Sequence, residues 1–520
     1  MELKTEVLII GSGIAGCSAA LAAARAGTSV MMITGMRNPE VSNTSKAQGG
    51  IVMHGEGDSP DLLAEDIQTA GAGICNPLAV RQLAEKGPEL VQELLIDDLH
   101  VPFTKTDSGE YSRTEEGAHS VPRILHAADL TGKAIIQTLH EAVRREKNID
   151  LRSGMLAVDL INIPDHGANR LDQYKQTSCA GAYVLDTDSG EVISIIARET
   201  ILATGGLGQI FLHTTNPVNA RGDGIAMAYR IGARLLNLEY VQFHPTALFH
   251  RDANRFLISE SMRGEGAVLI DHEGNAFMER YHPQGSLAPR DVVARAIHNE
   301  MLESDEPCVY LDITSKPADW VRNRFPHIYK TCLQYGVDIT SQPIPVVPAA
   351  HYSCGGIYVD LVGQTTIPHL RAAGEVACTG LHGANRLAST SLLEGLLWGW
   401  NTGEDVARNI RNNGANGKIP PIRPFQPETD PVDKALIYQD WRTIKRTMWN
   451  YVGLVRTPRR LSRAMSILRE LQQEILSFYR TAVPSNPIIG LRNGITTSLA
   501  VLFAVQRNQV SLGCHYITED

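Results

Sequence analysis

Val7-Leu-Ile-Ile10-Gly11-Ser12-Gly13-Ile14-Ala15-Gly16 is the segment that points to the architecture of this 520-residue chain. Residues 7–10 form a short apolar run that predicts a buried parallel strand, and the alanine-rich residues 17–26 predict a helix. Residues 29–33 predict a second strand. This strand-helix-strand order predicts an α/β protein with a doubly wound parallel sheet.

The three glycines of this segment have the spacing of a dinucleotide-binding turn. The first makes the tight turn, the second lets a pyrophosphate approach the backbone, and the third packs the helix against the sheet. The N–H groups at the helix N-terminus then bind the anion. A ribose usually meets an acid at the end of the second strand, but Thr34 and Gly35 stand there. A hydroxyl or backbone group must take that role, which disfavours a nicotinamide dinucleotide.

Two later segments favour FAD. Ala203-Thr-Gly-Gly206 ends a predicted strand in small residues that allow a close backbone approach. Gly374-Glu-Val-Ala-Cys-Thr-Gly380 is typical of the late segment that carries an acid to the ribityl or phosphate region of a flavin. Glu375 is that acid here.

The composition and net charge of the chain disfavour several classes of partner. The net charge of −9 and the pI of about 6.0 give no general attraction to nucleic acid or anionic lipid. The eight cysteines include no CxxC pair, which indicates a reducing compartment and no metal cluster. Residues 7–33 are apolar but carry glycines and Arg25, so they read as neither signal peptide nor membrane span. No other segment reads as a span, and a soluble cytoplasmic protein without a membrane partner is expected.

Three domains are predicted, built from four segments of the chain. Residues 1–237 and 348–415 form the dinucleotide-binding domain, and residues 238–347 form an insertion in it, where prolines interrupt short segments. The proline-rich residues 343–348 predict a hinge. A linker rich in Asn, Gly and Pro at residues 412–431 leads into a helical domain, residues 416–520. The basic cluster after Arg456 reads as a helix start, with Thr457 as N-cap and Pro458 at the first helical position, and not as a nucleic-acid site.

Six motifs together carry a specific resemblance. They are Ser42-Asn-Thr-Ser-Lys-Ala-Gln-Gly-Gly50, Gln242-Phe-His-Pro-Thr246, Ser259-Glu-Ser-Met-Arg-Gly-Glu-Gly-Ala267, Ala288-Pro-Arg-Asp-Val-Val293, His351-Tyr-Ser-Cys-Gly-Gly-Ile357 and Gly383-Ala-Asn-Arg-Leu-Ala-Ser-Thr-Ser-Leu-Leu-Glu394. On these residues the chain resembles the flavoprotein family of succinate dehydrogenase, fumarate reductase and L-aspartate oxidase. It departs from the family pattern at Thr390, where asparagine is usual, and at Ser259, where threonine is common.

The resemblance implies an FAD-binding Rossmann-like domain, an inserted α+β capping domain and a C-terminal helical domain. It also implies the residues that contact FAD: Gly11, Ser12, Gly13, Ile14, Ala15, Gly16, Gly35, Asn43, Thr44, Ser45, Lys46, Ala47, Gln48, Gly49, Gly50, Ala157, Val158, Ala203, Gly205, Asp223, Glu375, Ser391 and Leu392.

Two positions favour the L-aspartate oxidase branch. Members in membrane complexes carry a histidine, bonded covalently to FAD, where this chain has Asn43, so non-covalent FAD is expected. Glu116 matches a carboxylate that faces the amino group of the substrate. The branch implies oxidation of L-aspartate to iminoaspartate, with oxygen or fumarate as acceptor, as the first step of de novo NAD (quinolinate) biosynthesis. A transient contact with quinolinate synthase is a further expectation.

Other residues fit a dicarboxylate. Arg386 offers a planar fork for a carboxylate, and His244 and His351 can donate hydrogen bonds or carry charge. Gln242 and Ser259 would add neutral contacts. By resemblance, Arg290 transfers a proton at the β-carbon, with Glu260 as its relay and His244 beside it. The capping and FAD domains would then enclose the site between them.

Two other functions remain open. A fumarate reductase or succinate dehydrogenase flavoprotein subunit would need an iron–sulfur partner. A flavin-binding redox sensor would bind the cofactor without turnover.

Overall fold

The computed structural model describes residues 2–128, 130–253, 255–413 and 419–519. Its largest sheet has the order β6-β2-β1-β9-β8-β7, with β16 also paired to β9. The strands are β1 (Glu2–Ile10), β2 (Val30–Thr34), β6 (Ile149–Ser153), β7 (Met155–Asn162), β8 (Cys179–Asp186), β9 (Val192–Leu202) and β16 (Leu370–Ala372). The pairs among β6, β2, β1, β9 and β16 are parallel, whereas β7 and β8 add an antiparallel edge. The predicted α/β class with a Rossmann-like sheet is confirmed.

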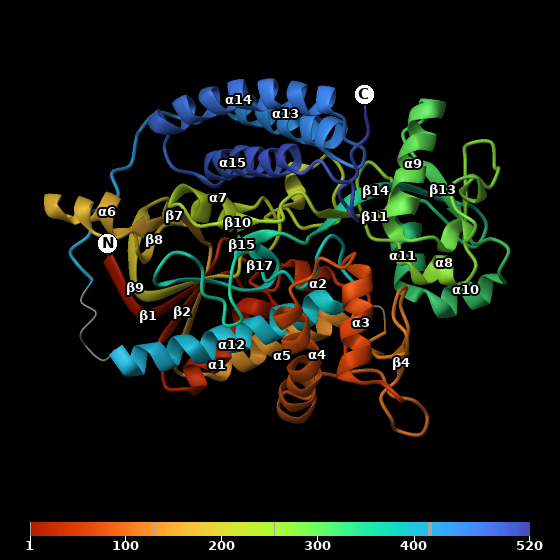
Figure 1. The fold of residues 1–520 in the computed structure, drawn as a ribbon, viewed down its shortest axis with the longest axis horizontal. Coiled ribbons are helices and arrows are strands. Elements are labelled where there is room, and N and C mark those ends of the chain that lie inside the picture. The colour runs from red at the N-terminus through yellow and green to blue at the C-terminus, as the bar shows by residue number, and fades with distance from the viewer. Residues whose placement is uncertain (1, 129, 254, 414–418, 520) are drawn as a thin grey trace.

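Helices gather at one side of this sheet, in more than one layer (Figure 1). They are α1 (Ile14–Arg25), α3 (Pro60–Ala70), α4 (Pro77–Leu90), which continues as a π-helix over Val91–Asp98, α5 (Thr131–Arg145) and α12 (Thr390–Asn413). Figure 1 shows α1 and α12 running side by side beneath the strands. Every residue of α1 except Arg25 is buried, because its run of alanines lets the helix sit close to its neighbours.

A second sheet, which is antiparallel, forms part of the capping unit at the right of Figure 1. Its order is β11 (Val241–Leu248), β14 (Ile344–Ser353), β13 (Val309–Asp312) and β12 (Val268–Ile270). It packs with α8 (Ser261–Gly264), α9 (Arg290–Ser304), α10 (Ala318–Arg324) and α11 (Pro326–Gln334). A separate hydrophobic core, which includes Leu269, Ile297 and Val346, holds the unit together. The expected α+β capping unit is therefore present, and the domain boundaries stay predictions.

Residues 344–348 of the predicted hinge form the first half of β14, where Pro345 pairs with Tyr310 of β13. This regular strand replaces the irregular connection that the prolines suggested, and hinge motion at these residues stays a prediction. Pro348 falls at the irregularity between the pairs His244–Ala349 and Ala247–Val347, so its missing N–H removes no regular ladder bond. Prolines at such positions mimic a linker in the sequence while they remain compatible with a strand.

The remaining elements are short. They are α2 (Asn43–Lys46), β3 (Ile51–Val52), β4 (Arg113–Thr114), β5 (Ile124–Leu125), α6 (Ile163–His166), α7 (Asp223–Arg230), β10 (Leu235–Leu236), β15 (Gly356–Tyr358) and β17 (Ala377–Cys378). The strands among them form two small sheets, β3-β5-β4 and β10-β15-β17.

The C-terminal helices are α13 (Lys434–Val452), α14 (Pro458–Thr481) and α15 (Asn486–Arg507), at the top of Figure 1. The predicted cap of α14 is confirmed, because the Thr457 hydroxyl accepts a hydrogen bond from the N–H of Arg460. In the predicted linker, residues 414–418 lie outside the described part, which also leaves the predicted start of this domain outside it.

The expectation that no further segment is apolar enough to span a membrane is wrong for α15. Its most apolar window has a mean hydropathy of 1.6, yet 89% of that window is buried inside the protein. The helix packs against α7, α13 and α14. It is a core helix, which composition alone does not distinguish from a span.

Candidate active site

A cavity of about 1000 Å³ lies where the large sheet meets the capping unit. One wall comes from the turn after β1, residues 41–50, residues 203–205 and the start of α12. The other wall comes from β11, residues 255–260, Arg290 and His351. The volume is at the upper end of the range for ligand sites, so it leaves room for a large cofactor and a small substrate.

The glycine turn shapes one end of the cavity. Gly11 has a φ of 121°, and a Cβ there would collide with the carbonyl group of Ala203. A Cβ on Gly16 would collide with the carbonyl oxygen of Gly11, so this glycine packs α1 against the turn. Gly13 is the N-cap of α1, without a side-chain cap and without an acid in the first turn. The N-terminus of α1 therefore offers N–H groups and a positive dipole end to a pyrophosphate.

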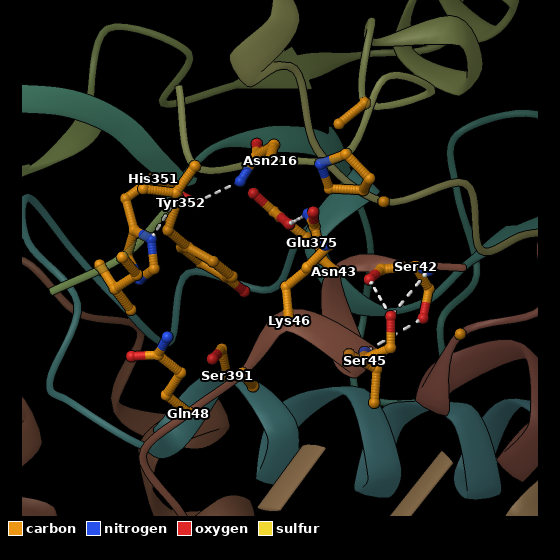
Figure 2. A pocket seen from close by; sticks show the side chains of 18 of the residues that line it. Ser42, Asn43, Ser45, Lys46, Gln48, Asn216, His351, Tyr352, Glu375 and Ser391 are labelled. Carbon is orange, nitrogen blue, oxygen red and sulfur yellow. Dashed lines mark hydrogen bonds between the residues drawn. The ribbon is translucent and has the colours of Figure 1, made fainter. Parts of the chain in front are cut away.

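Asn43 and Glu375 meet in the middle of the cavity wall (Figure 2). The amide nitrogen of Asn43 donates to Oε2 of Glu375 at 2.5 Å, and the N–H of Ser353 donates to Oε1 at 3.1 Å. Burial raises the pKa of Glu375 to about 7, against the lowering effect of these hydrogen bonds. Near neutral pH this carboxyl group can donate or accept a hydrogen bond.

Several polar atoms around the cavity fit the predicted FAD. The oxygens Asn43 Oδ1, Gln48 Oε1 and Thr204 Oγ1 are buried without a hydrogen-bond partner in the described part of the chain. All three residues line the cavity. Because unpaired buried polar atoms are costly, they indicate a polar ligand that pairs with them. These oxygens, the N–H groups at the N-terminus of α1 and the volume suit a dinucleotide.

Most residues predicted to contact the cofactor line this cavity. They are Gly11, Ser12, Gly13, Ile14, Ala15, Asn43, Thr44, Ser45, Lys46, Ala47, Gln48, Gly49, Gly50, Ala203, Gly205, Glu375, Ser391 and Leu392. Thr34 joins them where an acid is usual, as expected of a hydroxyl substitute.

Five predicted contacts do not line the cavity: Gly16, Gly35, Ala157, Val158 and Asp223. Gly16 and Gly35 serve close packing instead, since a Cβ on Gly35 would lie 3.0 Å from the side chain of Leu156. Ala157 and Val158 are buried in β7. Asp223 pairs with Arg221 at 2.8 Å, which turns it to the C-terminal helices.

Basic side chains gather at the other end. Arg290, at the start of α9, forms an ion pair with Glu260, which Arg263 approaches to 3.7 Å. Arg386 donates to Gln242 Oε1 at 3.0 Å and to Ser391 Oγ at 3.1 Å, so its described hydrogen bonds go to neutral groups. Burial and the charge of Arg290 lower the pKa of Arg386.

His244 and His351 face each other, with ring centroids 5.4 Å apart. Burial, with the neighbouring arginines, lowers the pKa of both imidazoles well below the ordinary value. Thr246 contacts Nδ1 of His244, and Thr215 Oγ1 lies 2.8 Å from Nδ1 of His351. In this arrangement both histidines are neutral hydrogen-bonding groups, and the alternative that they carry charge requires a bound anion.

The remaining predicted substrate residues divide. Glu116 and Ser259 line the cavity. Gln242 does not, and its amide nitrogen donates to the carbonyl oxygen of Arg386 at 3.0 Å. Gln242 thus brackets Arg386 from behind, because its place on β11 points the side chain to the Arg386 loop and not into the cavity.

The lining residues absent from the sequence prediction include Thr215, Asn216, Tyr352 and Ser389. Asn216 donates to the carbonyl oxygen of His351 at 2.9 Å (Figure 2). Tyr352 and Ser389 lie inside recognised motifs, next to predicted residues, so motif adjacency could have found them. Thr215 and Asn216 stand in no recognised motif.

Comparisons with known proteins agree with this geometry. Residues 6–392 match the family described as FAD binding domain. The L-aspartate oxidase of Pseudomonas aeruginosa is 44% identical over 98% of this chain and 94% of that protein. L-aspartate oxidase 1 of Ralstonia nicotianae is 43% identical over 99% of this chain and 95% of that protein. A chain of Escherichia coli quinol fumarate reductase superposes with a TM-score of 0.87 at 26% identity, over 100% of this chain and 92% of that one.

Proposed function

We propose that this chain, which belongs to the L-aspartate oxidase family of FAD-binding flavoproteins, oxidises L-aspartate to iminoaspartate. Oxygen or fumarate is the electron acceptor, and the reaction is the first step of de novo NAD biosynthesis. The cofactor is FAD, and Asn43 in place of a histidine makes its binding non-covalent.

One observation supports the assignment: the same cavity holds arginines that can bind carboxylates and a separate carboxylate, Glu116, that can bind an ammonium group. Arg290 and Glu260 are paired with each other, whereas Arg386 has neutral hydrogen-bond partners and remains available for an anion. Glu116 lines the cavity and lies within electrostatic range of both arginines. A dicarboxylate that also carries an ammonium group matches this set of charges.

The side chains divide the work of binding. Arg386, with its guanidinium held by Gln242 and Ser391, takes one carboxylate in two parallel hydrogen bonds. His244 and His351 donate to the carboxylates as neutral imidazoles, and Ser259 adds a hydroxyl. Glu116 pairs with the ammonium group and so orients Cα. FAD, when bound, would accept the hydride from Cα, and the ammonium group would lose a proton to solvent, which leaves the imine.

Arg290 and Glu260 serve the second half-reaction, in which reduced FAD, when bound, would supply a hydride to fumarate and the protein supplies a proton. Burial lowers the pKa of Arg290, but Glu260 and Glu116 outweigh it and the net pKa is raised, so the guanidinium stays protonated. It then delivers a proton to the β-carbon of fumarate, and Glu260, its direct partner, takes up a proton from solvent and passes it back to the guanidinium. Burial would raise the pKa of Glu260, and the surrounding arginines bring it below the ordinary value.

The cellular setting follows from the same chemistry. Imines hydrolyse in water, so a transient contact with the quinolinate synthase that consumes iminoaspartate would protect the product. A cytoplasmic location is supported by eight cysteines that are all free and buried.

Anaerobic addition of L-aspartate to the purified holoenzyme tests the proposal. Rapid bleaching of the flavin absorbance is expected with L-aspartate and not with D-aspartate or succinate. Glu116→Gln serves as the matched variant and should bleach far more slowly. No bleaching by L-aspartate, together with reoxidation of chemically reduced flavin by fumarate, would replace the proposal with a fumarate reductase. A flavin that no dicarboxylate reduces or reoxidises would indicate a binding module without turnover.

A further inference from the structure

Arg386 is a buried positive charge, and its hydrogen-bond partners, Gln242 and Ser391, are neutral. The side chain is 6% exposed, and Arg290 adds a second positive charge nearby. A carboxylate of the protein beside it would neutralise this charge, but would also compete with the substrate carboxylate. No ion pair to Arg386 occurs within residues 2–128, 130–253, 255–413 and 419–519, the part that the structure describes.

The ring of Tyr352 helps to stabilise the charge of Arg386. The guanidinium carbon of Arg386 lies 4.8 Å from the ring centroid, which is within the range of a cation–π contact. The ring attracts the cation without occupying its N–H groups. Tyr352 lines the cavity (Figure 2) and follows His351 directly in β14.

A buried carboxylate stands behind this ring. The Tyr352 hydroxyl donates to Oε2 of Glu394 at 2.9 Å, and His382 Nε2 lies 2.9 Å from the same oxygen. The other oxygen accepts a hydrogen bond of 2.6 Å from the Thr379 hydroxyl. Both oxygens of Glu394 are therefore engaged, and the residue is only 1% exposed.

Glu394 does not line the cavity. Burial would raise its pKa, but His382 and the three hydrogen bonds outweigh burial and leave the pKa below the ordinary value, so the group is ionised. A negative charge thus stands one side chain away from Arg386, behind an aromatic ring that prevents direct pairing. A hydrogen bond from a phenol to a carboxylate also makes the ring more electron-rich, which strengthens its attraction for a cation.

We propose that Glu394 is a positioning residue for substrate binding, which acts through the Tyr352 hydroxyl to orient the Tyr352 ring under Arg386. This inference rests on the proposed function, in which Arg386 receives a substrate carboxylate. Glu394 and Tyr352 would hold that arginine in place. Thr379 and His382 fix Glu394 in turn. Glu394, Thr379 and His382 do not line the cavity.

The test uses the holoenzyme and succinate, a dicarboxylate without an amino group, which under the proposed function binds without rapid turnover. Its Kd is measured from the perturbation of the flavin spectrum and, independently, from the rise in Tm that it causes. The variants are Tyr352→Phe, which keeps the ring and removes the hydroxyl, and Glu394→Gln, which keeps the size and removes the charge. Tyr183→Phe is the control, because the Tyr183 hydroxyl is also buried and bonded, to the carbonyl oxygen of Arg423 at 2.7 Å.

Both site variants should raise the Kd for succinate and the KM for L-aspartate about tenfold, with kcat changed less than threefold and the Kd for FAD unchanged. The control should leave all four constants as they are. In an Arg386→Lys background, Tyr352→Phe should add little, because its effect passes through the guanidinium. If Glu394→Gln does not fold, Tyr352→Phe alone and the double-mutant cycle of Tyr352→Phe with Arg386→Lys still test the inference.

Unchanged succinate binding in Tyr352→Phe would overturn the inference, as would full additivity with Arg386→Lys. Failure of the proposed function has a different signature, since the wild-type flavin would then not be bleached by L-aspartate while the succinate comparison still holds. A wild-type protein that is bleached by L-aspartate but does not bind succinate would overturn the inference and leave the proposed function standing.

Discussion

The hydroxyl of Ser389 donates a hydrogen bond of 2.7 Å to Oε2 of Glu116 and accepts one of 3.1 Å from the N–H of Gly50. Ser389 holds a left-handed backbone conformation with a φ of 58°, which costs a non-glycine residue on the order of 1 kcal/mol. The carboxylate proposed to pair with the substrate ammonium is thereby tied to the loop proposed to hold the cofactor. One hydroxyl connects the two proposed sites.

Glu116→Gln should separate the two reactions of the site. The kcat/KM for L-aspartate oxidation should fall by about 100-fold, which is about 2.7 kcal/mol, because the ammonium loses its ion pair. Fumarate reduction by the reduced enzyme should fall less than about fivefold, since fumarate has no ammonium. Steady-state kinetics of both reactions provide the measurement. Equal loss in both would show that Glu116 has no role in amine recognition.

Arg290→Lys should show the opposite preference. A proton at the β-carbon is needed only when fumarate is reduced, so fumarate reduction should fall by about 100-fold or more. The anaerobic reduction of the flavin by L-aspartate should fall much less. Stopped-flow absorbance measures each half-reaction separately. An aspartate half-reaction that drops as far as the fumarate one would place Arg290 on both paths.

Gly13→Ala should abolish FAD binding while the apoprotein still folds. A Cβ on Gly13 meets only side-chain atoms of Thr44 and Ser42, the nearest at 3.3 Å, but it occupies the space that a pyrophosphate needs. Gly16→Ala is the matched comparison, because its Cβ would strike the Gly11 carbonyl oxygen and should destabilise the fold itself. FAD fluorescence titration and thermal unfolding of the apoproteins distinguish the two. Tight FAD binding by Gly13→Ala would contradict the assignment of the turn.

Glu375 should make the stability of the apoprotein depend on pH. Its pKa is raised from 4.5 to about 7, so the folded state binds more protons than the unfolded state between these values. The free energy of unfolding should therefore fall as the pH rises from 4.5 to 7, by at most about 3 kcal/mol, and then level off. Glu375→Gln removes this contribution. Urea unfolding of both proteins from pH 5 to pH 8 is the measurement, and parallel curves would refute the prediction.

The sequence by itself determined the Rossmann-like start, the glycine turn and the use of FAD. Each depends on a local pattern: an apolar run, three glycines at fixed spacing and a helix that follows. The N-cap Thr457 was predictable for the same reason, because a cap involves only neighbouring residues. The roles of individual site residues, by contrast, stay predictions that the mutants above can test.

Only the tertiary structure decided which side chains meet. Gln242 faces Arg386 from behind because β11 pairs antiparallel with β14, in a register that sets Gln242 against Tyr352 and His244 against Ala349. The same pairing sets His351 near His244 and the Tyr352 ring beneath Arg386. Register between strands a hundred residues apart depends on packing across the sheet, and no local pattern records it. The proline-rich strand and the apolar core helix follow the same principle, because burial by distant segments, and not their own composition, decided what they became.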